Sequence, residues 1–206
     1  MARKELEHFY IGDSYGGNQD WFRSFMMRIG GCAAETACDS SLYFALHKGI
    51  DGIYPFDKTC LTRNDYVDFA HRMEKYLWPR MSGVNRTELF IDGYANYLKD
   101  CGVGCIRMQS FSGDEPYEKA ADALMRQIDA GYPVPALILN HRDKSMKDYV
   151  WHWFLINGYD TQDGQDELLI RTVTYSEYQW ISLRKLWNTG CDLKGGLVLY
   201  EICTVQ

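Results

Sequence analysis

Two short segments of the sequence carry the residue types that thiol chemistry requires. Cys32 follows a glycine pair and opens a run of small residues, and His152 stands far downstream, at the start of the apolar run 153–156. A thiol nucleophile needs a neighbouring base to take its proton, and histidine serves most often. Unpaired backbone N–H groups at a helix start also favour thiolate over thiol. The two segments therefore predict a catalytic pair of Cys32 and His152.

Composition and charge narrow the class of protein. The chain has 206 residues, of which 46% are hydrophobic and 15% aromatic, so we expect one domain over residues 1–206 with a sizeable core. The longest apolar runs, such as 135–139, are too short to span a bilayer, and no apolar stretch of a secretory signal follows the N-terminus. The formal charge is -6 without runs of Lys or Arg. We therefore expect a cytoplasmic protein that binds neither nucleic acid nor membrane.

The seven cysteines indicate free thiols. Their number is odd and their spacing follows no disulfide framework, which is typical of an intracellular protein. Cys101 and Cys105 lie close together, but a structural zinc site needs four ligands and no second close pair of Cys or His exists. Cys38, in the middle of the same predicted helix as Cys32, is expected to pack in the core. The sequence predicts no metal site and no cofactor.

Hydrophobic periodicity and turn residues predict helices first and strands last. Helices are expected over 32–48, 63–77, 86–99 and 117–129. Strands are expected over 105–111, 134–139, 149–157, 167–175, 178–182 and 197–203. The pattern predicts an α+β fold, with helices in the N-terminal half and an antiparallel sheet in the C-terminal half.

Hairpin geometry points to a third member of the site. If residues 160–166 make the turn between two strands, the centre lies near 163, and His152 should face a partner near 174 or 175. Among the nearby hydroxyls, Thr174 has a better register than Thr172 or Ser176. A hydroxyl accepts from an imidazole N–H but carries no negative charge. We therefore expect Thr174 to orient His152.

The order of these features resembles the papain-like cysteine peptidase fold. The closest likeness is to the bacteriocin-processing, double-glycine-leader peptidase group and its uncharacterised bacterial relatives. It is carried by residues 31–34 (GCAA), by residues 152–160 (HWFLINGYD) and by a strand-rich tail. The resemblance implies N-terminal helices packed on a C-terminal antiparallel sheet. It also implies Cys32 as nucleophile, His152 as general base, an upstream Gln as oxyanion donor, and an Asp or Asn on the next strand.

The chain departs from that family pattern at three positions. Ala33 follows the nucleophile where the family usually has Gly, and Thr174 stands where the family has Asp or Asn. Gln19 lies 13 residues before Cys32, so the segment 21–29 must loop or coil away for its amide to return to the site. Asn18 is the alternative oxyanion donor. The candidates for substrate contact are Asn18, Gly31, Trp151 and Trp153.

These residues predict a thiol hydrolase that cleaves a peptide, amide or thioester bond through an acyl-enzyme on Cys32. An acyltransferase using the same pair is the enzymatic alternative, because the acceptor is set by what enters the cleft and not by the pair itself. The alternative from another class is a binding protein that retains the fold but does not catalyse the reaction at a useful rate. The expected partner is a peptide or a small acyl or amide substrate, and the oligomeric state is left open.

Overall fold

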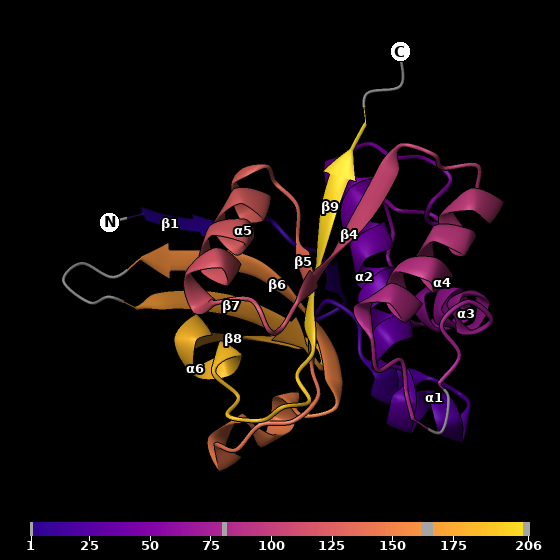
Figure 1. Cartoon of the computed structure of the whole chain (residues 1–206). Coiled ribbons are helices and arrows are strands. Elements are labelled where there is room, and N and C mark those ends of the chain that lie inside the picture. The colour runs from indigo at the N-terminus through magenta and orange to yellow at the C-terminus, as the bar shows by residue number, and fades with distance from the viewer. Residues whose placement is uncertain (1, 80–81, 162–166, 204–206) are drawn as a thin grey trace.

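The computed structural model describes residues 2–79, 82–161 and 167–203 (Figure 1). Within these ranges the helices are α1 (Phe25–Gly30), α2 (Cys32–His47), α3 (Arg63–Glu74), α4 (Thr87–Asp100), α5 (Tyr117–Asp129) and α6 (Leu183–Trp187), with short 3₁₀ helices η1 (Gln19–Trp21) and η2 (Lys144–Tyr149). The strands are β1 (Ala2–Glu5), β2 (Tyr10–Ile11), β3 (Ser14–Tyr15), β4 (Ile106–Ser112), β5 (Val134–Ile138), β6 (His152–Thr161), β7 (Leu168–Thr174), β8 (Glu177–Ser182) and β9 (Gly196–Ile202).

One antiparallel sheet dominates the described part of the chain. Its strands run in the order β4-β9-β5-β6-β7-β8, and β1 pairs with the far end of β6, while β2 and β3 form a separate two-stranded pair. Figure 1 shows α1 to α4 gathered on one side of these strands and α5 with α6 on the other. The predicted α+β class with a large antiparallel sheet is confirmed. In the same ranges, no helix is long and apolar enough to cross a bilayer.

Several element boundaries differ from the expected ones. The strand expected from residue 149 begins at His152, because residues 144–149 form η2 and Trp151 takes a left-handed φ of 53° that breaks extended backbone. The helix expected over 63–77 ends at Glu74. The segment 21–29, expected to loop or coil, contains most of α1, and β1 and α6 were not expected. Of the expected turn at 160–166, residues 162–166 lie outside the described residues.

Helix α2 is the central element, and its first residue is Cys32, the candidate nucleophile. Every residue from Cys32 to Ala45 is buried. The small side chains of Ala33, Ala34 and Ala37 let the helix approach its neighbours closely, and it packs on β6 and on α3. This packing brings the N-terminus of α2 to the beginning of β6.

Candidate active site

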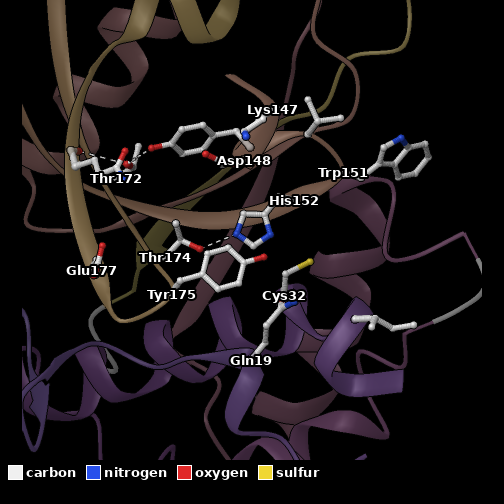
Figure 2. Close-up of a pocket in the computed structure, with 14 residues that line it drawn as sticks. Gln19, Cys32, Lys147, Asp148, Trp151, His152, Thr172, Thr174, Tyr175 and Glu177 are labelled. Carbon is white, nitrogen blue, oxygen red and sulfur yellow. Dashed lines mark hydrogen bonds between the residues drawn. The ribbon is translucent and has the colours of Figure 1, made fainter. Parts of the chain in front are cut away.

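A cavity of about 630 Å³ lies at the N-terminus of α2. Residues from four separate elements line it: Gln19 from η1, Cys32 from α2, His152 from β6 and Thr174 from β7, followed by Tyr175 in the turn after β7. Figure 2 shows the Cys32 thiol and the His152 imidazole facing this space. The chain thus brings together the four side chains that the sequence singles out as catalytic.

Cys32 is the first residue of α2 and is 9% exposed. Gly31 is needed before it, because a Cβ there would lie 2.3 Å from the backbone oxygen of Met27. Burial raises the pKa of the Cys32 thiol to about 11, although the backbone N–H groups of Trp153 and Ala33 lower it in part. The expectation that the helix start favours the thiolate is therefore wrong in its net direction. Loss of water outweighs the few N–H groups that face the sulfur.

His152 opens β6, where it pairs with Ile138 of β5, and only 4% of its surface is exposed. Burial lowers the pKa of the imidazole to about 4, so the ring is neutral at physiological pH. Its Nε2 lies 2.6 Å from Thr174 Oγ1. The ring of Tyr175 stacks on the imidazole face, with 5.0 Å between the ring centroids and 5° between the planes. Contacts along one edge and across one face hold the imidazole in place.

The three hydroxyls near the expected register have separate partners. Thr174 contacts His152, whereas Thr172 Oγ1 lies 2.8 Å from the Tyr149 hydroxyl and Ser176 Oγ donates to the backbone oxygen of Gly17 at 3.3 Å. Thr174 is therefore the hydroxyl that contacts the imidazole, but the register inferred from the sequence is wrong: a hairpin centred at 163 would pair residues 155 and 171, whereas Leu155 pairs with Val173 and the register shifts between Ile156 and Gly158.

Gln19 reaches the cavity because the segment between it and Cys32 coils into η1 and α1. Its side chain is buried, and its Nε2 donates to the backbone oxygen of Arg28 in α1 at 2.9 Å. An amide nitrogen has two N–H groups, so a second donor remains on the same atom. Gln19 Oε1 is buried without a hydrogen-bond partner in the described part of the chain. The insertion thus returns Gln19 to the cavity that Cys32 also lines.

The candidates for substrate contact divide into two groups. Trp151 is 49% exposed and lines the main cavity as well as a second cavity of about 340 Å³, which Trp153 and Cys32 also line. Trp153 itself is buried, and its Nε1 donates to the backbone oxygen of Val84 at 2.6 Å. Asn18 and Gly31 do not line either cavity in the described residues: Asn18 caps η1 by accepting from the Asp20 N–H, and Gly31 precedes α2.

The site contains features that sequence reasoning missed. Tyr175 and Ser176 both have left-handed backbone, with φ of 51° and 64°, in a turn without Gly or Asn, the residues that usually signal such a conformation. Glu35 and Asp39 on α2 are buried although both are acidic. For metal binding, the described residues contain no group of three or more His, Cys, Asp or Glu side chains arranged to hold an ion.

Comparisons of the chain with protein-family models, with curated proteins and with solved structures found no match.

Proposed function

We propose that this chain is a papain-like thiol hydrolase that cleaves a peptide, amide or thioester bond through an acyl-enzyme on Cys32. One observation carries the proposal: a thiol, an imidazole with an oriented Nε2 and a buried amide converge on one cavity from elements far apart in the chain. A nucleophile, a base held by a third group and an oxyanion donor are the parts that acyl transfer requires.

The electrostatics favour proton transfer during attack over a preformed ion pair. A thiol with a pKa of about 11 and an imidazole with a pKa of about 4 are both neutral at pH 7. Before their mutual attraction is counted, moving the proton from Cys32 to His152 costs about 10 kcal/mol, at about 1.4 kcal/mol for each pKa unit. The proton therefore moves as the new bond forms, when the developing charge is shared with the substrate.

Each group then has a defined role. With Nε2–H directed at Thr174 Oγ1, Nδ1 of His152 takes the thiol proton as Cys32 Sγ bonds to the carbonyl carbon. The Cys32 backbone N–H and Gln19 Nε2 donate to the oxyanion. When the intermediate collapses, the bond to the leaving group breaks and that group takes the proton from Nδ1. Water then gives a proton to Nδ1 as it attacks the thioester, which releases the acid and restores the thiol.

Intact-mass spectrometry after mixing with a small acyl thioester tests this proposal. We expect one acyl adduct, mapped to Cys32 by digestion, that is lost in Cys32→Ala and strongly reduced in His152→Ala. Cys38→Ala is the matched control, because Cys38 is buried on the same helix. Equal labelling of all three variants, or no adduct on the native chain, would refute a Cys32 acyl-enzyme.

A binding protein is the second candidate, and the neutral third group favours it. Thr174 supplies no charge to stabilise an imidazolium, and burial shifts the pKa values of Cys32 and His152 apart. For such a protein, a peptide or acyl ligand would bind without any covalent adduct. An acyltransferase is distinguished by adding an amine acceptor to the acylated protein. In that case the acyl group leaves as an amide faster than it leaves as an acid.

A further inference from the structure

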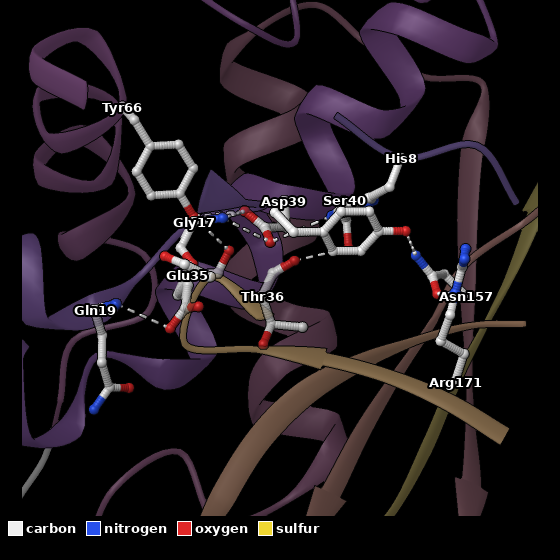
Figure 3. A network of polar contacts seen from close by, with 12 residues as sticks. His8, Gly17, Gln19, Glu35, Thr36, Asp39, Ser40, Tyr66, Asn157 and Arg171 are labelled. Carbon is white, nitrogen blue, oxygen red and sulfur yellow. Dashed lines mark hydrogen bonds and ion pairs between the residues drawn. The ribbon is translucent and has the colours of Figure 1, made fainter. Parts of the chain in front are cut away.

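A short loop at residues 16–19 is held against α2 by two buried acids (Figure 3). Glu35 and Asp39, one helical turn apart on α2, are each 4% exposed. The Gly17 N–H donates to both oxygens of Asp39 at 3.2 Å, and the Gln19 N–H donates to Glu35 Oε2 at 3.2 Å. The backbone on which the Gln19 side chain stands is therefore held by carboxyl oxygens from the helix of the nucleophile.

The loop is also closely packed. The Tyr66 hydroxyl donates to Asp39 Oδ1 at 2.6 Å, and a Cβ on Gly17 would lie 1.9 Å from that hydroxyl. Gly16 has a φ of 79°, and a Cβ there would lie 2.8 Å from Asp39 Oδ2. Two glycines are needed because the backbone itself contacts Asp39 and Tyr66. Little space remains for another arrangement of the loop.

On its other side the loop contacts the turn that holds the imidazole. The backbone oxygen of Gly17 accepts from the Ser176 N–H at 2.9 Å, and the Tyr15 N–H donates to the Ser176 oxygen at 3.0 Å. Ser176 directly follows Thr174 and Tyr175, which contact His152. This loop therefore contacts both the helix that carries Cys32 and the turn that follows Thr174 and Tyr175, and it carries Gln19 between them.

The direction in which the pKa of Glu35 is shifted suits this location. Burial, and then the nearby Asp39, raise the pKa of Glu35 well above its usual value. A raised pKa favours the protonated form, which still accepts from the Gln19 N–H and places less negative charge beside the Cys32 thiol, whose loss of a proton a carboxylate would oppose. Glutamine, which is neutral and nearly the same shape, should therefore replace Glu35 with little loss.

We propose that Glu35 is a positioning residue that holds Gln19 where its amide donates to the oxyanion, an inference that rests on the proposed function. Removing the Glu35 carboxyl releases the Gln19 N–H and leaves a buried donor unpaired, so the loop shifts and the amide leaves its position. Acylation by a thioester develops an oxyanion and needs that donor. Alkylation by iodoacetamide does not: Sγ displaces iodide from a tetrahedral carbon, and the thiol proton passes to His152 or water.

The experiment compares these two reactions at Cys32 by mass spectrometry. We expect Glu35→Leu to slow acylation by about 10- to 100-fold, less than the roughly 100- to 1000-fold found when an oxyanion donor is removed outright, and to leave the rate of alkylation within about threefold. Glu35→Gln should restore acylation to within a few-fold of the native rate. Ser40→Ala is the matched control, because Ser40 is buried on the same helix and its Oγ donates to the Thr36 oxygen.

A double-mutant cycle tests whether Glu35 acts through Gln19. If it does, Glu35→Leu should slow acylation little further in a Gln19→Ala background. The inference would be overturned if the double variant lost acylation rate by the product of the two single-variant factors. It would also be overturned if Glu35→Leu lost acylation and alkylation equally. If Glu35→Leu does not fold, Glu35→Met takes its place, because it keeps the length of the side chain while its sulfur is only a weak acceptor for the Gln19 N–H. It should slow acylation alone, and unchanged acylation would overturn the inference.

The two proposals fail differently. A native chain that is never acylated at Cys32 would overturn both. A native chain that is acylated at Cys32, with Glu35→Leu acylated at the same rate, would overturn only the role of Glu35.

Discussion

Replacing Thr174 with aspartate should convert a weak imidazole partner into a strong one. Thr174 Oγ1 lies 2.6 Å from His152 Nε2, so a carboxylate there contacts the same nitrogen. A neighbouring opposite charge shifts a pKa by about 1 to 3 units, which raises the pKa of His152 from about 4 toward the neutral range. The cost of moving the Cys32 proton to His152 then falls by about 1.4 to 4 kcal/mol. We expect Thr174→Asp to raise the population of the Cys32 thiolate paired with a His152 imidazolium by about 10- to 1000-fold, which should show as faster alkylation of Cys32 near pH 7.

The assay is the rate of iodoacetamide labelling at Cys32 from pH 5 to 11, with the exposed Cys60 as an internal reference. In the native chain the rate should rise with pH and level off only near the pKa of about 11 of the Cys32 thiol. Thr174→Asp should add a shoulder near neutral pH. Thr174→Asn has the size of Asp without its charge and should lack the shoulder, while Thr174→Ala should change the rate only modestly. Identical profiles for Asp and Asn would refute the electrostatic reasoning.

Three further predictions follow from burial and packing. Because the pKa of His152 falls from 6.5 unfolded to about 4 folded, its contribution to stability is present above pH 6.5 and lost as pH falls to 4. The loss is about 3 kcal/mol, and urea unfolding of His152→Gln should lack this slope. Gln19→Ala should slow acylation by about 100- to 1000-fold and spare alkylation, which rapid-mixing mass spectrometry measures. Gly17→Ala, with its Cβ 1.9 Å from Tyr66 Oη, should destabilise the fold by about 2 kcal/mol or more in thermal melts, whereas Gly104→Ala, whose Cβ contacts nothing within 4 Å, should not.

Patterns of neighbouring residues in the sequence predicted those helices and strands whose bounds depend on neighbouring residues alone. The helix Tyr117–Asp129 was expected within the same bounds, because its apolar spacing is regular and Gly131 and Pro133 follow it. The start of α2 at Cys32 followed from the preceding glycines. Counting across a hairpin singled out Thr174, which does contact His152, but the count was two residues out of register, because the sequence does not reveal the shift between Ile156 and Gly158 that leaves Leu155 opposite Val173.

The features that the sequence did not predict depend on contacts between residues far apart in the chain. Strand β1 pairs with β6, joining Ala2 to Thr161, and no local signal marks a partner so distant. The return of Gln19 depends on the path of α1, a helix of six residues whose Phe25 and Ile29 side chains are exposed, so its apolar pattern gives no core-facing stripe. The raised pKa of Cys32 depends on how many atoms surround the sulfur, which a helix-start pattern does not report.

The same burial that opposes charge separation in the resting site strengthens the groups that stabilise charge during reaction. Hydrogen bonds to an oxyanion are worth more where water is excluded, provided that the donors are already aimed. In this site the alignment depends on fixed backbone: the N–H of Cys32 at a helix start, and a Gln19 amide whose loop is held by Glu35 and Asp39. Without a carboxylate beside His152, the imidazolium is poorly stabilised, so the site is least suited to leaving groups that need a proton before they depart. A thiolate departs without one. Under the proposed function we therefore expect thioesters to acylate Cys32 faster than amides, because both need His152 to take the Cys32 proton but only the amide leaving group needs a proton from the imidazolium.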